Sequence, residues 1–292
     1  MESSPVTSFE QERGRLFGIA YRMLGSVSEA EDVVQDAYLR WHGVNHGQVE
    51  NPQAYLVRLV TNLAMDTLGA ARYRRTEYIG PWLPEPLVQT AQAADPASRH
   101  DVADDLSMAF MLVLERLTPV ERAVFVLHES LDFSYAEIAT IIGKSTENCR
   151  QIARRARQHL AAEHYAAPAD PVTHEQILTR FLLATETGDL QGLLELLASD
   201  AVIYSDGGGK VQAARNPVVG AERVARLILG VIAKGLEVGA DFRLAMINGR
   251  PGVLTLLHDQ IQATFSIHVV DGRIHSAYVV ANPDKLPQGR EF

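Results

Sequence analysis

The chain of 292 residues has little cysteine, few aromatic residues and no long apolar run. Its one cysteine, Cys149, leaves no disulfide framework and no cysteine-based metal site. No apolar run approaches the roughly 18 residues of a membrane span, and residues 1–15 lack the apolar stretch of a signal peptide. No His, Asp and Glu spacing typical of a metal site stands out, and no cofactor is expected. We therefore expect a reduced, cytoplasmic protein.

Basic residues are outnumbered, and the formal net charge of −9 at first argues against a nucleic-acid partner. Their distribution changes that interpretation. Residues 145–160 contain four arginines against Glu147 alone, and Arg72, Arg74 and Arg75 form a second basic cluster. DNA-binding capacity would therefore lie in two patches on an acidic body.

The N-terminal third reads as helical. Apolar residues recur at three-four spacing over 8–42, where Ser28 and Glu31 look like a capping box that begins a second helix. After a loop, 42–50, Asn51-Pro52 begins a helix that runs towards residue 75.

A second helical segment begins near residue 104. Thr118-Pro119 and Ser134–Glu137 are typical helix starts, and the short helix after Ser134 should end at Gly143. A longer basic helix follows from Ser145 to about residue 165. A short helix, a glycine turn and a basic helix are the outline of a helix-turn-helix.

The C-terminal part has a different pattern. Helices are expected at about 173–187, 190–198 and 220–234, and alternating strands are punctuated by the hairpin dipeptides Asn248-Gly249 and Asp271-Gly272. We expect an α+β domain with a curved antiparallel sheet after two all-α domains. The predicted boundaries are a first helical domain over 8–77, a proline-rich linker over 78–103, the helix-turn-helix domain over 104–165, a short linker over 166–172 and the α+β domain over 173–286.

The basic helix separates an apolar face from a polar face. The polar residues near its start match base edges in the major groove: Thr146, Asn148, Arg150, Gln151 and Arg154. Arg155 and Arg157 are better placed for phosphates. The alternative is an amphipathic helix whose arginine face is only solvated.

The segment EIATIIGKSTENCRQIARRARQHL (137–160) resembles the region 4 helix-turn-helix of extracytoplasmic-function (ECF) sigma factors, which reads the −35 promoter element. LFGIAYRMLGSVSEAEDVVQDAYLRW (16–41) resembles sigma region 2, which docks on RNA polymerase. The resemblance implies that Asp32, Gln35 and Asp36 face the core polymerase (β and β′ subunits), although a solvated acidic face is the alternative.

PQAYLVRLVTNLAMDTLGAARYRR (52–75) resembles the helix that opens and holds the −10 element, with a flipped base captured by the loop 42–50. Melted DNA needs aromatic platforms and cations. The helix carries aromatic, cationic and polar residues that could serve in this way: Tyr55, Arg58, Asn62, Arg72, Tyr73, Arg74 and Arg75. Asn62 and Asp66 could instead form local helix contacts.

Residues 173–286 resemble a SnoaL-like domain of the NTF2-like superfamily, as in the sigma-J type subgroup of ECF factors. Three motifs carry this resemblance: Trp82-Leu-Pro84-Glu-Pro86, Asp206-Gly207-Gly208-Gly209-Lys210 and Asn282-Pro283-Asp284-Lys285-Leu286. It implies regulation in cis, with 282–286 touching the linker at 82–86 or the DNA-binding domains. It also implies a pocket that could hold a small molecule.

Two other classes of function stay open. One is a ligand-responsive regulator that binds duplex DNA through 145–160 alone. The other is a SnoaL-like enzyme fused to a DNA-binding module, in which Tyr204, Asp206, His258 and His268 lie on predicted strands and an Asp–His pair would do acid–base chemistry. We assign no catalytic residue, favour the sigma factor, and expect a monomer when free.

Overall fold

The computed structural model describes residues 5–75, 77–89, 106–162 and 168–287, apart from the side chains of residues 5, 72–74, 89 and 162. The chain divides into two compact units. The first comprises residues 1–76, 95–106 and 110–165. The second comprises residues 77–94, 107–109 and 166–292, so the linker after residue 76 belongs to the same unit as the C-terminal domain. Each unit is described by itself.

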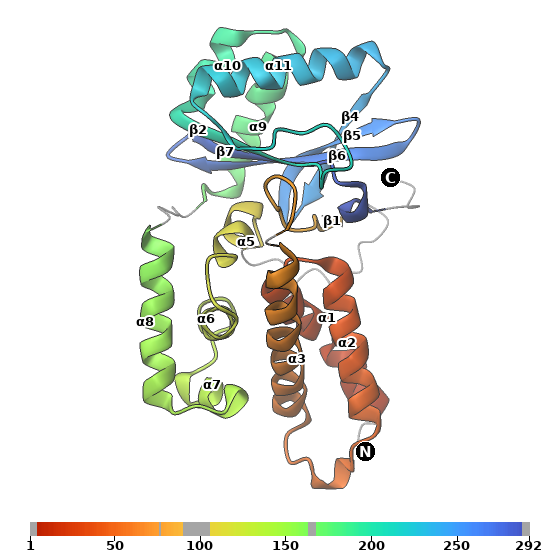
Figure 1. Ribbon diagram of the computed structural model, residues 1–292, viewed down its shortest axis with the longest axis vertical. Helices are drawn as coiled ribbons and strands as arrows, with labels where there is room; N and C mark the ends of the chain where they lie inside the picture. The colour runs from red at the N-terminus through yellow and green to blue at the C-terminus, as the bar shows by residue number, and fades with distance from the viewer. Residues whose placement is uncertain (1–4, 76, 90–105, 163–167, 288–292) are drawn as a thin grey trace. The chain divides into compact units, whose positions relative to one another are not determined.

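The N-terminal part of the first unit is helical, as predicted. Its elements are α1 (Pro5–Leu24), α2 (Val27–His42), the 3-10 turn η1 (His46–Gln48) and α3 (Pro52–Arg75). The three long helices pack on one another (Figure 1). The predicted start of α2 was wrong: Ser26, not Ser28, is the N-cap, and its hydroxyl accepts from the amide of Glu29. Gly25, at φ +66, lets the chain turn directly after α1, so α2 begins two residues earlier than expected.

The second helical segment contains the predicted helix-turn-helix. Its elements are α5 (Met108–Leu114), α6 (Pro119–Phe125), the π-helical turn η2 (Val126–Ser130), α7 (Tyr135–Ile142) and α8 (Thr146–Ala162). The predicted capping box of Ser134 with Glu137 is present, and Thr118, predicted as a helix start, forms a capping box with Glu121. Gly143 ends α7 in the left-handed region at φ +66, where a side chain would be strained.

The C-terminal unit is a curved sheet with helices on one face (Figure 1). Its helices are α9 (Pro171–Glu186), α10 (Leu190–Leu196), α11 (Ala221–Glu237) and the 3-10 turn η3 (Pro283–Lys285). Its strands are β1 (Val88–Gln89), β2 (Leu197–Asp206), β3 (Val218–Val219), β4 (Asp241–Ile247), β5 (Arg250–Leu257), β6 (Gln260–Val270) and β7 (Arg273–Val280), in the order β1-β4-β5-β6-β7-β2-β3. The sheet is mixed rather than wholly antiparallel, because β2 and β7 run parallel.

Tight turns fix the register of the sheet. Asn248-Gly249 and Asp271-Gly272 have positive φ at both positions, as predicted for two-residue hairpins. A third turn, His258-Asp259, also has positive φ at both residues. The placement of His258 on a strand was therefore wrong, because this turn forms without a glycine and leaves no glycine signal in the sequence.

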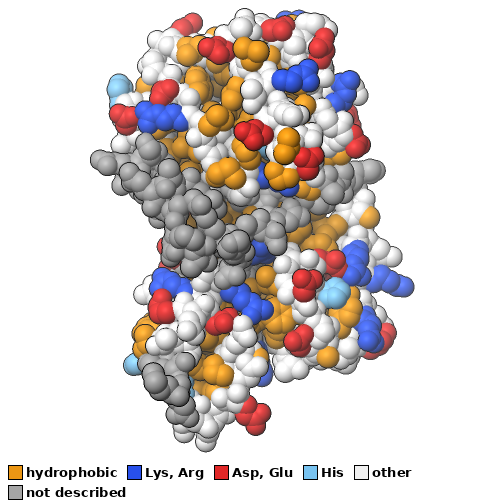
Figure 2. All heavy atoms as spheres, turned by 180° about the vertical axis from the view of Figure 1, so that it is seen from behind, with side chains coloured by type: hydrophobic (Ala, Val, Ile, Leu, Met, Phe, Trp, Pro, Cys, Tyr) orange, Lys and Arg blue, Asp and Glu red, His pale blue; other side chains and the backbone are white. Residues whose placement is uncertain are grey.

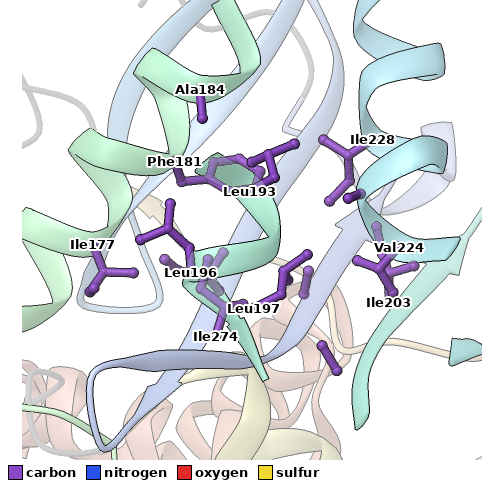
Figure 3. Close-up of a cluster of buried hydrophobic side chains, with 14 of the residues drawn as sticks. Ile177, Phe181, Ala184, Leu193, Leu196, Leu197, Ile203, Val224, Ile228 and Ile274 are labelled. Carbon is purple, nitrogen blue, oxygen red and sulfur yellow. The ribbon is translucent and has the colours of Figure 1, made fainter. Parts of the chain in front are cut away.

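The core of the C-terminal domain lies between the helices and the sheet. Side chains from α9, α10 and α11 meet those of β2, β6 and β7, and Figure 3 shows Phe181, Leu193, Ile203 and Val224 among them. The ring of Phe181 stacks on Phe265 with centroids 5.1 Å apart. This packing places apolar side chains where the sheet curves around the helices.

We predict that Phe181→Ala destabilises the C-terminal unit by about 3–5 kcal/mol, because it removes a buried ring and leaves a cavity. Leu183→Ala is the matched control, since Leu183 lies on the same helix but is 62% exposed. Urea unfolding followed by circular dichroism measures both variants. Equal stabilities for the two variants would contradict this account of the core.

Candidate nucleic-acid and polymerase interfaces

The helix-turn-helix presents α8 with one buried and one exposed face. Cys149, Ile152, Ala153, Ala156 and Leu160 are buried against the rest of the segment, and α6 and α7 both pack on α8. Burial raises the pKa of the Cys149 thiol, which keeps it a neutral core residue. Six predicted DNA contacts are exposed and Thr146 is half-buried. The exposed six are Asn148, Arg150, Gln151, Arg154, Arg155 and Arg157.

Carboxylates and a tyrosine hold two arginines of this face. Arg157 donates to the Glu129 carboxylate and, over 3.2 Å, to the Tyr135 hydroxyl; these bonds raise its pKa. Arg150 lies 6.0 Å from the centre of the Tyr135 ring and 3.6 Å from Glu147. Both side chains are thereby oriented on the exposed face, where 60% of the Arg150 side chain and 48% of the Arg157 side chain are exposed.

The helix α3 carries the residues predicted for the −10 element. Tyr55 is half-buried with its ring centre 5.6 Å from that of Trp41, Arg58 is exposed, and Asn62 is half-buried. The side chains of Arg72, Tyr73 and Arg74 lie outside the described residues. Arg75, at the end of α3, does not project into solvent: it donates to the Glu115 carboxylate and to the carbonyl of Leu24.

The loop before α3 is ordered around a tryptophan. The buried Trp41 contacts the His46 ring edge-on, with centroids 4.3 Å apart. Within the described ranges, the Nδ1 atom of His46 is buried without a hydrogen-bond partner, whereas Asn45 and Gln48 are exposed. Sequence reasoning identified this loop but no residue in it.

The polymerase-facing residues predicted on α2 lie on one exposed face. Asp32, Gln35 and Asp36 are exposed, and Leu39, one turn further, is 62% exposed beside them. The four positions share one side of the helix because they are three and four residues apart. The sequence analysis did not identify Leu39, because a single leucine does not by itself mark a binding surface.

The three motifs of the C-terminal unit meet at one place, which we call the linker clasp: Tyr78, Trp82, Leu83, Asp206, Asn282 and Lys285. The Asp206 carboxylate is 1% exposed and accepts from the Tyr78 hydroxyl at 2.5 Å, the Leu83 amide at 2.8 Å and the Lys285 ammonium at 2.7 Å. Burial, and then Asp206, raise the pKa of Tyr78, so its hydroxyl stays protonated as a donor.

Aromatic rings complete the clasp. Lys285 lies 4.2 Å from the Trp82 ring centre and 4.8 Å from that of Tyr78, and it donates to the Leu83 carbonyl at 2.5 Å. Asn282 donates to the Tyr78 hydroxyl at 2.8 Å. A buried ammonium is thus satisfied by one carboxylate, one carbonyl and two π-faces.

The other motif residues support this arrangement. Pro283 begins η3, Lys210 pairs with Asp284, and Pro84 and Leu286 are buried. Further along, the linker becomes an edge strand: Val88 pairs with Ile247, and the Leu87 amide and carbonyl both bond to Asn248. The strand β1 was missed because two residues in a proline-rich segment are too few to show the alternation of apolar and polar residues that marks a strand.

The glycine motif serves close packing. A Cβ on Gly208 would lie 2.4 Å from the Asn282 amide nitrogen, and one on Gly209 would lie 2.9 Å from Ile79; both glycines have positive φ. A Cβ on Gly207 would lie 2.7 Å from the Val211 carbonyl oxygen. The amide of Gly208 also donates to Asp206. The run is therefore occupied by the chain's own contacts.

No Asp–His pair forms among the four candidate enzymatic residues. His258 is exposed in its turn, Tyr204 stacks on Tyr278, and Asp206 is held in the clasp. The register places His268 opposite Ser276, whereas Asp206 aligns with Val280. Asp206 and His268 are thus separated by about four residues along the strands, roughly 13 Å. This geometry gives the enzyme alternative no acid–base pair.

Basic and acidic side chains lie interspersed on the face that Figure 2 shows. Among the described residues, no helix combines the length and apolarity needed to cross a lipid bilayer.

Two families match the helical segments: Sigma-70 region 2 over residues 9–75 and Sigma-70, region 4 over residues 107–160. The chain is 37% identical to the ECF RNA polymerase sigma factor SigJ of Mycobacterium tuberculosis, over 96% of this chain and 93% of that protein. The chain belongs to the ECF sigma factors. The probable ECF sigma factor SigI of the same species is 31% identical, over 98% of this chain and 96% of that protein.

The crystal structure of Mycobacterium tuberculosis SigJ has a similar fold throughout. Its TM-score is 0.79 at 35% identity, over 96% of this chain and 97% of that chain. In this sigma factor the predicted fold class is confirmed, with helical regions 2 and 4 and an α+β C-terminal domain, except that the sheet is mixed.

We predict that Gly208→Ala loosens the linker clasp and destabilises the C-terminal unit of this sigma factor by about 1–3 kcal/mol, because the added methyl meets Asn282 at positive φ. Gly230→Ala on α11, where an added Cβ meets no atom of the described residues within 4 Å, should be neutral or stabilising by about 0.5–1 kcal/mol. Thermal unfolding of the two variants beside the natural protein makes the comparison. A Gly208→Ala protein as stable as the natural one would argue against the clasp.

Proposed function

We propose that this ECF sigma factor directs core RNA polymerase to specific promoters, melts the −10 element, and is regulated in cis by its C-terminal domain. The observation that supports promoter recognition is the exposed polar face of α8 on a capped helix-turn-helix, in the same chain as region 2. A stand-alone regulator would use α8 but would leave the exposed acidic face of α2 and the helix α3 without a role.

For the −35 element, Arg150, Gln151, Asn148, Thr146 and Arg154 would contact base edges in the major groove, since arginine matches guanine, and asparagine and glutamine match adenine. The two remaining exposed arginines, Arg155 and Arg157, would contact phosphates. The bonds from Arg157 to Glu129 and Tyr135 fix its direction before DNA arrives.

For the −10 element, the residues on α3 would hold the melted strand: Tyr55, Arg58, Asn62, Arg72, Tyr73, Arg74 and Arg75. We also propose that His46 takes part in capturing the flipped base. Its ring already contacts Trp41 edge-on, and among the described residues its buried Nδ1 lacks the hydrogen-bond partner that a base edge could supply.

For the core polymerase, Asp32, Gln35 and Asp36 would contact the β and β′ subunits, with Leu39 as an apolar anchor at the centre of the contact. Charged residues around an apolar side chain are typical of binding hot spots, in which the rim excludes water. The core of the C-terminal domain is packed with apolar side chains, and a small-molecule partner stays an untested expectation.

We predict that Leu39→Glu weakens binding to core polymerase by about tenfold or more, which corresponds to about 1.4 kcal/mol. The change places a charge at a position that would be desolvated on binding. Leu183→Glu is the matched control, because Leu183 is equally exposed but lies on α9 of the C-terminal domain. Fluorescence anisotropy of the labelled factor with core polymerase measures both. Equal affinities of the two variants would exclude Leu39 from the interface.

Regulation in cis would act through the linker clasp. The linker connects the two DNA-binding regions, and the clasp and the β1–β4 pairing bind it to the C-terminal domain. A linker held at both points has less freedom to let the regions take separate positions on a promoter. Breaking the clasp should therefore favour the form of the sigma factor that binds core polymerase and promoter DNA over the free form.

Run-off transcription with core polymerase on a promoter library tests both parts of the proposal. We expect promoter-dependent transcripts from the natural protein and about threefold more from Lys285→Met, whose side chain fills the same space without the charge. Lys234→Met, an exposed lysine on α11, should leave transcription unchanged. No transcript from folded natural protein would contradict the sigma role, whereas unchanged output from Lys285→Met would contradict regulation by the clasp.

A further inference from the structure

A buried ionic network links regions 2 and 4 within the first unit. Glu115, between α5 and α6, accepts from Arg122 at 2.7 Å and from Arg75, the last residue of α3. Arg122 also donates to the Met23 carbonyl at 2.8 Å, and Arg75 to the Leu24 carbonyl at 2.6 Å. These carbonyls end α1, where intrahelical donors run out and positive charge is favourable.

This network is shielded from water. The Arg122 side chain is fully buried, that of Arg75 is 13% exposed and that of Glu115 is 16% exposed. Burial by itself raises the pKa of Glu115, but the two arginines outweigh it and hold that pKa below its usual range. The carboxylate is therefore ionised at neutral pH, and removing it would leave two guanidinium groups in a poorly solvated place.

The network crosses the boundary between the two regions. Arg75 closes the region 2 segment, whereas Glu115 and Arg122 belong to region 4. A second contact crosses the same boundary, where Arg15 of α1 lies 5.0 Å from the Phe133 ring centre. The two regions are thus joined by specific polar contacts and not by apolar packing alone.

Joined in this way, regions 2 and 4 cannot both reach a promoter. The −35 and −10 elements lie about 25 base pairs apart by position, roughly 85 Å of B-DNA at 3.4 Å per base pair. A compact body of about 140 residues, the size of this unit, has a diameter of only about 40 Å. The contacts between the two regions must therefore open before both elements are bound.

Arg75 makes the opening depend on DNA itself. It belongs to the set predicted to hold the −10 strand, and the guanidinium fork matches carboxylate and phosphate with the same two-pronged geometry. In the closed unit that fork is taken by Glu115 and Leu24. A carboxylate thus pairs with the arginine that the proposed function assigns to the DNA strand.

We propose that Glu115 is an internal phosphate mimic, which holds region 4 on region 2 and is displaced when Arg75 engages promoter DNA on core polymerase. Closure then competes with DNA for the same arginine. This inference rests on the proposed promoter role of Arg75, while the closed state itself rests on the contacts of Glu115 and Arg122.

Distances between spin labels test the closed state in the full chain. Labels at Gln11→Cys on α1 and Gln158→Cys on α8 report on regions 2 and 4, both positions being exposed, in a Cys149→Ala background. We expect one short, narrow distance distribution for the free factor. Glu115→Gln should broaden and lengthen it, as should adding core polymerase to the protein that retains Glu115. Glu222→Gln, which breaks an exposed pair with Arg226 on α11, is the matched control and should change nothing.

Binding to a −10 fork DNA without polymerase provides the second readout. Glu115→Gln should bind about three- to tenfold more tightly, because the competing closed state is less populated. Circular dichroism establishes folding, and if Glu115→Gln does not fold, Glu115→Asp takes its place, since the shorter side chain cannot reach both arginines. Unchanged distances and unchanged DNA affinity in the folded variant would overturn the proposal.

The outcome for core polymerase is decisive by itself. If the label distance in the protein that retains Glu115 stays short when core polymerase and promoter DNA are bound, the network does not open and the proposal is wrong. Run-off transcription by the natural protein is independent of this result. Failure of transcription would refute the sigma role, while lengthening of the label distance in free Glu115→Gln would still establish the closed state.

Discussion

A buried carboxylate must be satisfied on every side, and Asp206 imposes this constraint on the C-terminal unit. It ends β2, is almost fully buried, and would be costly to bury without the donors that surround it. Three of those donors come from elsewhere in the sequence: Tyr78, Leu83 and Lys285. The linker therefore belongs to the C-terminal domain for an electrostatic reason, and the β1–β4 pairing extends an attachment that Asp206 makes necessary.

Glu115 applies the same constraint to the first unit, with a different consequence. Its partners, Arg75 and Arg122, also satisfy the free carbonyls at the end of α1, so one carboxylate orients two arginines that cap a helix. Burial makes such a network costly to break on one side only. If another anion replaces the carboxylate, every guanidinium stays paired. A phosphate therefore displaces Glu115 at a lower free-energy cost than water does.

Much of this architecture could be predicted from the sequence, because it rests on local signals. The helix start at Thr118, the capping box at Ser134 and the hairpin dipeptide Asn248-Gly249 each depend on residues within one turn, and each was found. The errors have the same explanation. Ser26 and Ser28 both suit an N-cap, and the choice between them depends on the turn at Gly25. The turn at 258–259 uses His and Asp in a backbone region usually assigned to glycine.

The residues of the candidate site likewise divide into those that local signals predict and those that only the fold brings together. An exposed helix face follows from periodicity, so the α8 and α2 positions could be read directly. The partners of Asp206 and Glu115 could not, because they are separated by 123 residues for Leu83 and by 40 for Arg75, and no periodicity encodes such distances. The glycine run shows the difference: its motif could be recognised in the sequence, but its function as close-packing space for Asn282 and Ile79 required the fold.

The acidic balance of the chain can be reconciled with DNA binding through these pairs. Arg75 and Arg157, both predicted DNA contacts, already carry carboxylate partners, Glu115 and Glu129. When a phosphate displaces such a partner, the DNA releases counterions but the freed carboxylate gathers cations again. The net release per contact is then smaller than for an unpaired arginine. Binding by this factor should accordingly depend less steeply on salt than its number of phosphate contacts suggests, and its closed state should be favoured where DNA and polymerase are absent.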